Sequence, residues 1–346
     1  MLSPQYDFYS DTLTKPTPDM RKFMCDAEVG DEQRFEDPTV NQLQDMVAEM
    51  TNKEGGLYLP SGTMCNEIAF LVNCLQGDEI IMDISAHPYN AELGAPAALG
   101  GITVRPLVGN RGVFTAEQVE EAIRPATRYP TRTRLVSIEQ TANLTGGVIW
   151  PITRIHEVFD VAKKHNLFMH MDGARVFNAV VATGIPLHKY AEYFDTVWID
   201  FSKGLGAPVG AVLAGNKEFI KEAWRWKQRL GGAMRQAGII AAACIYALKH
   251  NINRLAEDHE NAKYLAEKLC ELPGISVNPK DVETNIVIFD IAGTGKTALQ
   301  FADELSPHSV RFTVIGKTRM RGVTYLGITK KHIEDAIEIV GKILKK

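Results

Sequence analysis

The chain has 346 residues, 45% of them hydrophobic and 23% charged, and its formal net charge is −4 at pH 7. This composition is ordinary for a globular protein with an ample core, and the charge gives no basic footprint for nucleic acid or an anionic membrane. No apolar run is long enough to span a bilayer, the first residues lack the features of a signal peptide, and the five cysteines show no C-x-x-C spacing. We therefore expect a cytoplasmic protein without membrane or nucleic-acid partners and without a metal site.

The first part of the chain contains two helix starts. Residues 1–35 are expected to form an N-terminal arm that lies on another surface, with a helix following Pro18. Asp37 precedes Pro38 and predicts the N-cap of a helix that runs to about Thr51.

A further helix is predicted to begin at Ser61-Gly62-Thr63, directly after a short apolar strand over 56–59. Small residues at a helix N-terminus leave backbone N–H groups free, and here they add two hydroxyls, which suits an anion such as phosphate. Taken alone, the tripeptide is explained more simply by an ordinary N-cap.

Strand-like and helix-like segments alternate after this point. Further strands are predicted at 79–83, 102–107, 134–139, 167–172, 196–203 and 210–214, with helices such as 115–123 and 152–164 between them. This alternation predicts an α/β fold with a mostly parallel, doubly wound sheet that has helices on both faces.

The C-terminal part reads as a smaller unit. A long helical stretch runs from about Met234 past Cys270, and two strand-like segments follow at 284–291 and 321–326, before a final helix that begins near Lys331. We expect a large domain over residues 36–250 and a small C-terminal α/β domain over 251–346.

The segment 196–210 is an apolar strand that ends in Ser202-Lys203 and a glycine- and proline-rich turn. Val197, Ile199, Phe201 and Lys203 share one parity, so in a strand they share one face. The lysine then lies at the carboxyl end of the strand, where open α/β sheets place their ligands, and its amine can attack a carbonyl. A surface lysine at a strand end is the simpler alternative for this motif by itself.

Two more motifs contain chemically useful groups. In the segment 170–175, His170 and Asp172 lie on one strand face and Arg175 follows a Gly-Ala turn, so that Asp172 and Arg175 can hold a ring nitrogen and an anionic group of one ligand. A surface ion pair at a turn explains them about as well. His87 follows another strand, and a single histidine there is usually a satisfied structural residue.

Together, a lysine at a strand end, an aspartate on an earlier strand and a Ser-Gly-Thr helix start make a set that suits pyridoxal phosphate. The chain resembles the L-threonine aldolase / aromatic amino acid β-eliminating lyase family of the aspartate aminotransferase superfold, known as fold type I. The motifs that carry this resemblance are Glu36-Asp37-Pro38-Thr39, Pro60-Ser61-Gly62-Thr63-Met64, His170–Arg175, Ser202–Gly210 and Leu230–Gln236. It implies a mostly parallel seven-stranded sheet in the large domain.

The resemblance also implies pyridoxal 5'-phosphate as the cofactor and assigns its contacts. Lys203 matches the Schiff-base lysine, Asp172 the partner of the pyridinium nitrogen, and His87 the histidine stacked on the cofactor ring. Further cofactor contacts are implied for Ser61, Gly62, Thr63, Arg175, Ser202 and Arg229. Of these, Arg229, or alternatively Lys227, is expected to reach the phosphate of a neighbouring subunit, because family members are dimers or tetramers.

On the substrate side, the resemblance assigns carboxylate binding to Ser10, Arg175 and Arg321, and places Glu92 near them. His87, or a water molecule that it orders, is the expected base for a substrate hydroxyl. The implied reaction is retro-aldol cleavage of a β-hydroxy-α-amino acid such as L-threonine or L-allo-threonine to glycine and an aldehyde.

Three other readings stay open. The same scaffold supports β-elimination from an aromatic amino acid or racemisation, which the fold alone does not separate. A cofactor-binding module without activity is disfavoured by the intact Lys203 and Asp172. A nicotinamide dehydrogenase is disfavoured because no G-x-G-x-x-G follows the first strand.

Overall fold

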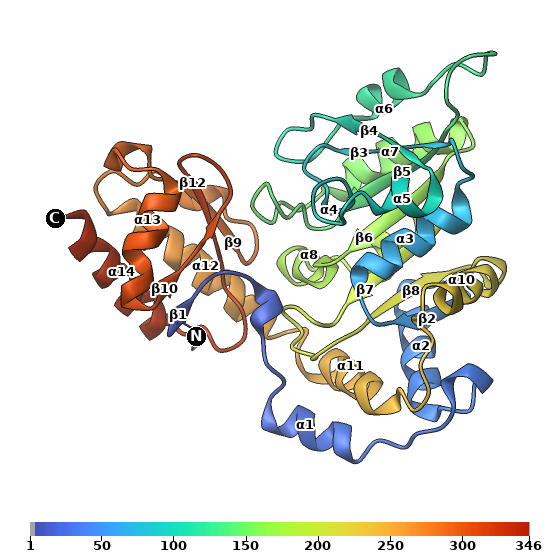
Figure 1. Cartoon of the computed structure of the whole chain (residues 1–346), viewed down its shortest axis with the longest axis horizontal. Coiled ribbons are helices and arrows are strands. Elements are labelled where there is room, and N and C mark those ends of the chain that lie inside the picture. Colours follow the sequence, from blue (N-terminus) through green and yellow to red (C-terminus); the bar gives the residue numbers. More distant parts are fainter. Residues whose placement is uncertain (1–3, 346) are drawn as a thin grey trace.

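The computed structural model describes residues 4–345. Within this range, seven strands form one sheet in the order β2-β8-β7-β6-β5-β3-β4, and only β8 runs antiparallel to its neighbours. The strands of this sheet are β2 (Gly55–Leu59), β3 (Glu79–Asp83), β4 (Thr103–Leu107), β5 (Thr133–Glu139), β6 (Phe168–Gly173), β7 (Thr196–Asp200) and β8 (Ala211–Gly215). The predicted fold class, a mostly parallel sheet flanked by helices, is confirmed (Figure 1).

Helices cover both faces of the sheet because its strands are apolar on both sides. On β7, Val197 and Ile199 pack into one core cluster with α2 and α11, whereas Trp198 packs into another with α3 and α10. The helices are α1 (Pro18–Cys25), α2 (Pro38–Thr51), α3 (Gly62–Asn73), α4 (His87–Asn90), α5 (Ala95–Gly100), α6 (Ala116–Ala122), α7 (Ile152–Lys164), α8 (Val176–Thr183), α9 (Leu187–Ala191), α10 (Lys217–Arg229), α11 (Gly238–His250), α12 (Leu255–Cys270), α13 (Ala298–Leu305) and α14 (Lys330–Leu344). None of the helices in the described range is long and apolar enough to cross a membrane.

A second core forms around a small antiparallel sheet in the order β11-β12-β9. Its strands are β9 (Ile286–Asp290), β11 (Thr313–Val314) and β12 (Arg319–Val323), and α12, α13 and α14 pack against them. The N-terminal strand β1 (Tyr6–Asp7) pairs in parallel with β10 (Val310–Arg311), and Phe8 stacks on Phe312 with ring centroids 5.1 Å apart. The start of the chain therefore packs with its C-terminal elements, as Figure 1 shows.

Two sequence-based boundaries differ from the structure. The strand predicted to continue to Lys203 ends at Asp200, because the Asp200 carboxylate accepts hydrogen bonds from both the backbone N and the Oγ of Ser202, at 2.7 Å each. Such local side-chain bonds compete with the strand ladder. The single helical stretch predicted from Met234 past Cys270 is two helices, α11 and α12, separated by residues 251–254.

Candidate active site

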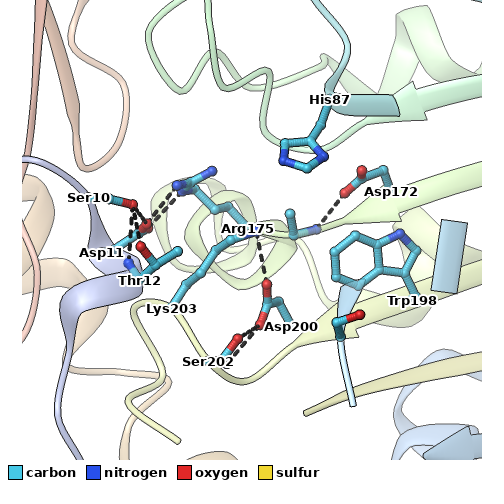
Figure 2. A network of polar contacts seen from close by, with 12 residues as sticks. Ser10, Asp11, Thr12, His87, Asp172, Arg175, Trp198, Asp200, Ser202 and Lys203 are labelled. Atoms are coloured by element: carbon cyan, nitrogen blue, oxygen red, sulfur yellow. Dashed lines mark hydrogen bonds and ion pairs between the residues drawn. The ribbon is translucent and has the colours of Figure 1, made fainter. Parts of the chain in front are cut away.

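The candidate site lies at the carboxyl ends of three adjacent parallel strands, β5, β6 and β7. Glu139 on β5 is in register with Asp172 on β6, and Asp172 with Trp198 on β7. Figure 2 shows His87, Asp172, Arg175 and Lys203 around a common space. The fold thus brings together side chains from distant parts of the chain, in the position where α/β sheets bind ligands.

Lys203 lies in the turn that follows β7. Its Nζ is 2.9 Å from Oδ2 of Asp200 and 5.7 Å from the centre of the Trp198 ring, and its side chain is only 17% exposed. Asp200 also accepts the Ser202 bonds described above, so one carboxylate fixes both residues of the Ser-Lys motif. The amine is therefore held at the strand end with limited access to solvent.

Asp172 is 1% exposed, and its two oxygens accept hydrogen bonds from protein groups. Oδ1 accepts from the backbone N of Ala174 at 3.0 Å and Oδ2 from Nδ2 of Asn66 at 2.9 Å. Burial raises the pKa of Asp172, and the charge of Lys203 and the Asn66 bond oppose that rise. A cationic partner facing this carboxylate would favour its ionised form.

Asn66 connects the residues beneath the site. Its Oδ1 accepts from Nε1 of Trp198 at 2.7 Å and faces Nε2 of His170 at 3.1 Å. Because the indole N–H can only donate, this contact fixes the orientation of the amide. The Nδ2 group must then face Asp172 at 2.9 Å and Oε1 of Glu92 at 2.8 Å, which makes both carboxylates acceptors.

His87 begins α4 and reaches the site from the opposite side. Its Nδ1 is 2.7 Å from Oε1 of Glu92, and this hydrogen bond raises the pKa of His87. Glu92 was predicted to lie near the substrate. The structure buries its carboxylate against His87 and Asn66, so that in this chain it acts on the site through His87.

Arg175 forms a buried two-point ion pair with Asp11. Its Nε and Nη2 donate to Asp11 at 2.7 and 2.6 Å, and Nδ2 of Asn285 donates to the same carboxylate at 3.1 Å. Burial alone would raise the pKa of Asp11, but the charge and hydrogen bonds of Arg175 outweigh it and lower this pKa to about 2. Ser10 lies beside this pair, and its Oγ caps the short helix η1 (Asp11–Leu13).

Arg321 lies on β12 and brings a second buried guanidinium to this end of the site. Its Nη1 donates to Oδ1 of Asn143 at 2.7 Å and its Nη2 to the carbonyl of Tyr9 at 3.3 Å, but its Nε has no acceptor among residues 4–345. Burial and the charge of Arg175 lower the pKa of Arg321. Two guanidinium groups with one carboxylate partner favour a further anion between them.

The N-terminus of α3 offers free amides near the same strand ends. Ser61 caps the helix by accepting from the backbone N of Met64 at 3.2 Å, and the amides of Gly62 and Thr63 find no acceptor within the described part of the chain. A Cβ on Gly62 would lie 2.2 Å from the Trp198 ring, so only glycine lets the helix start this close to the sheet. This geometry suits an anionic group.

The two basic residues considered for an intersubunit contact differ in their surroundings. Lys227 is fully buried and pairs with Glu32. Arg229 is exposed at the end of α10, and its guanidinium lies 4.7 Å from the centre of the Trp226 ring. Only Arg229 therefore presents its charge at the surface of the subunit.

Sequence reasoning assigned no role to four polar residues of the site: Asp11, Asn66, Glu139 and Asp200. Each is buried, and burial raises the pKa of Glu139 to about 8. The clearest missed signal is the pair Asn66-Glu67, which interrupts the apolar run of α3 on its buried side. Buried polar residues require partners, so such an interruption marks a network.

Comparison with known proteins agrees with this arrangement. A family model described as beta-eliminating lyase matches residues 7–292. A low specificity L-threonine aldolase of Escherichia coli K12 is 40% identical over 330 residues, covering 95% of this chain and 96% of that protein. Low-specificity L-threonine aldolase 1 of Arabidopsis thaliana is 38% identical over 339 residues, covering 96% and 94%.

A solved structure of a threonine aldolase from Leishmania major has a TM-score of 0.84 at 19% identity, covering 97% of this chain and 99% of that chain, which supports the fold. The resemblance inferred from the sequence motifs is confirmed by the family model and by the relatives' identity over nearly their full length. The chain belongs to the beta-eliminating lyase family.

Proposed function

We propose that the protein is a pyridoxal-phosphate-dependent aldehyde-lyase that cleaves L-threonine, L-allo-threonine or a related β-hydroxy-α-amino acid to glycine and an aldehyde. The observation that carries this proposal is the convergence of a held lysine, Lys203, and a buried carboxylate, Asp172, at neighbouring strand ends. Relatives named low-specificity L-threonine aldolase, 38–40% identical over nearly the whole chain, support the substrate class.

The residues present fit the cofactor. Lys203 would attach it covalently through Nζ, Asp172 would hold the proton on its ring nitrogen, and the free amides of Gly62 and Thr63 would bind its phosphate. The raised pKa of the buried Asp172 fits this role, because a protonated ring nitrogen supplies the missing cationic partner. When bound, pyridoxal phosphate would supply an electron sink for the substrate Cα.

The substrate carboxylate would bind at the end of the site where Arg175 and Arg321 meet. The buried Nε of Arg321 has no partner in the described part of the chain, and Arg175 uses Nε and Nη2 for Asp11. The Ser10 hydroxyl donates to the Asp11 carboxylate that pairs with Arg175, and it would add a neutral donor for the substrate. Fixing the carboxylate there orients the Cα substituents and so selects the bond that breaks.

His87 would move the proton of the substrate hydroxyl. Its Nδ1 is engaged by Glu92, and its Nε2 has no partner among the described residues, so this nitrogen remains available to accept a proton. The bond to Glu92 stabilises the protonated ring that results, which is the direction of its pKa shift.

We also propose that the protein works as a homo-oligomer, a dimer or a tetramer, in the cytoplasm. In this assembly, Arg229 reaches the cofactor phosphate of a neighbouring subunit. The exposed apolar side chains of Phe35, 64% exposed, and of Leu93 support an interface. The division into an arm, a large domain and a small domain near residue 250 is part of the same proposal.

Two measurements on purified protein test the function. After borohydride reduction of the cofactor-loaded protein, peptide mapping is expected to find the label on Lys203; label on any other lysine contradicts the assignment. Incubation with L-threonine, L-allo-threonine and L-phenylserine is expected to release glycine and the matching aldehyde. Pyruvate and ammonia in place of glycine would identify a β-eliminating activity instead.

A further inference from the structure

Three buried carboxylate oxygens behind His87 have no hydrogen-bond partner among residues 4–345. They are Oε1 and Oε2 of Glu67 and Oε2 of Glu92, on side chains that are 2% and 4% exposed among the described residues. Burial, the charge of Glu92 and a hydrogen bond with Glu92 raise the pKa of Glu67, so the two carboxyl groups are neighbours. Ionised carboxylates can only accept, so as two anions they could not satisfy each other and would repel. A single proton shared by the two carboxyl groups removes the repulsion and supplies the missing hydrogen-bond donor.

The neighbouring donors show which carboxyl group keeps the negative charge. Oε1 of Glu92 accepts from Nδ2 of Asn66 at 2.8 Å, and the Trp198 contact fixes the orientation of that amide. The same oxygen meets Nδ1 of His87 at 2.7 Å. Glu92 thus has two donors, whereas Glu67 has none within residues 4–345, so the charge is favoured on Glu92 and the proton on Glu67.

We propose that Glu67 is a protonated carboxylic acid that donates its O–H to Oε2 of Glu92 and is thereby a positioning residue for the Glu92–His87 pair. Glu92 then accepts three hydrogen bonds and stays ionised. It holds neutral His87 as the Nδ1–H tautomer, with the lone pair of Nε2 facing the site. The consequence for catalysis rests on the role proposed above for His87, but the location of the proton does not.

The charges around the pair act in the same direction. Burial and the Glu92 charge raise the pKa of Glu67 to about 9. Asp172 and Glu139 are the other carboxyl groups near His87, and both favour its protonated form. The negative charge of each of these groups disfavours ionisation of Glu67 when Glu92 is already ionised. A protonated His87, which contacts Glu92, would instead favour ionisation of Glu67.

Unfolding measured at different pH values tests directly whether Glu67 is protonated in the folded state. The folded pKa of Glu67, about 9, lies above the ordinary value of 4.5. Between these two pH values the folded state holds a proton that the unfolded state has released, so the stability of the wild type falls as the pH rises from 4.5 to about 9. Glu67→Gln keeps a donor and titrates nowhere. Its Tm relative to wild type is therefore expected to increase steadily from about pH 5 to about pH 9, with and without cofactor.

Glu49→Gln, the same change on an exposed position of α2, is the matched control and is expected to give a difference that does not change with pH. A Glu67→Gln difference that is constant over this range overturns the proposal, because it would mean that Glu67 is already ionised in the folded protein. This measurement does not depend on turnover, so it stands even if the proposed reaction is wrong.

Kinetics then distinguish which carboxyl group carries the proton. Glu67→Gln is expected to keep the wild-type pH profile of kcat/KM for glycine release, since the donor to Glu92 remains. Glu67→Leu removes that donor, so the acidic limb is expected to move to higher pH. Glu92→Gln removes the charge beside His87 and is expected to lower kcat/KM by about tenfold or more. The assignment would be refuted if Glu67→Gln and Glu67→Leu had the same pH profile of kcat/KM, or if Glu92→Gln left kcat/KM unchanged.

Discussion

At the scale of single residues, the site depends on charged groups that are buried and only partly compensated. Asp172 accepts two hydrogen bonds from neutral donors, and one donor of Arg321 has no acceptor within the range that the structure describes. Buried charges of this kind are costly unless a ligand completes them. The positions of the incomplete partners therefore indicate where a cationic ring nitrogen and an anionic carboxylate would bind.

Asp172→Asn is expected to keep the cofactor bound but to lower turnover by about 10²-fold or more, because a neutral amide cannot hold the proton on the ring nitrogen. The measurements are the cofactor absorbance of the purified variant and its rate of glycine release. Asp83→Asn is a matched control: Asp83 is a buried aspartate at the carboxyl end of β3 that bonds Ser85 and Gly109. It is expected to turn over normally, and an Asp172→Asn variant that did the same would contradict the assignment.

The residues that could be predicted from the sequence are those whose position follows from one element. Asp172 lies near the end of one apolar strand and Lys203 follows another, and the carboxyl ends of parallel strands meet at one sheet edge. Asn66 could not be assigned in this way, because its partners Asp172, Glu92 and Trp198 come from three separate segments. Only its polarity within an apolar helix could have drawn attention to it.

At the scale of elements, the Asp11–Arg175 pair joins the short helix η1 to the start of α8, and Asn285 next to β9 adds a third attachment. These elements belong to different parts of the chain. Both partners of the ion pair are buried, so removal of one leaves the other uncompensated.

Asp11→Asn is expected to lower the free energy of unfolding by about 3–5 kcal/mol at neutral pH, because Arg175 is left buried without a carboxylate. The folded pKa of Asp11, about 2, lies below its ordinary value of 3.8, so its stabilisation is present above 3.8 and is lost as pH falls towards 2. Denaturant unfolding at about pH 7 and about pH 3 is therefore expected to give a smaller difference at the lower pH. An undiminished difference there would exclude this ion pair as the cause.

Element boundaries were predicted well where a cap or a turn residue marks them. Asp37 caps α2, and Ser61 caps α3, as their local motifs indicate. The end of β7 was placed too late, because the alternation of apolar residues continues to Phe201 while the Asp200 side chain already turns the backbone. The alternation of apolar residues indicates which residues are buried. It does not indicate where a side-chain hydrogen bond replaces a backbone hydrogen bond of the sheet.

At the scale of the whole molecule, the site takes residues from three parts of the chain: Ser10 and Asp11 from the N-terminal segment, Arg175 from the turn that follows β6 of the large sheet, and Arg321 from β12 of the small sheet. The N-terminal segment is fixed by its pairing with β10, where Tyr6 is in register with Val310. A pairing between such distant segments leaves no local sequence pattern. For this reason the sequence suggested only an arm that lies on another surface.

The exposed Arg229 leads to a prediction about the assembly. If it completes the phosphate site of a neighbouring subunit, each active site contains Lys203 from one chain and Arg229 from another. Lys203→Ala and Arg229→Ala are then each expected to lose most activity, the first by losing the cofactor attachment and the second by weakening phosphate binding.

Mixed oligomers separate this arrangement from a site within one chain. When the two variants are unfolded together in equal amounts and refolded, about half of the dimers formed at random are hybrids, and each hybrid has one site with both native residues. Activity at limiting cofactor is therefore expected to return to about a quarter of the wild-type value, while each variant refolded alone stays inactive. If Arg229 serves the site of its own chain, a hybrid only combines two defective sites, and the mixture stays as inactive as its components.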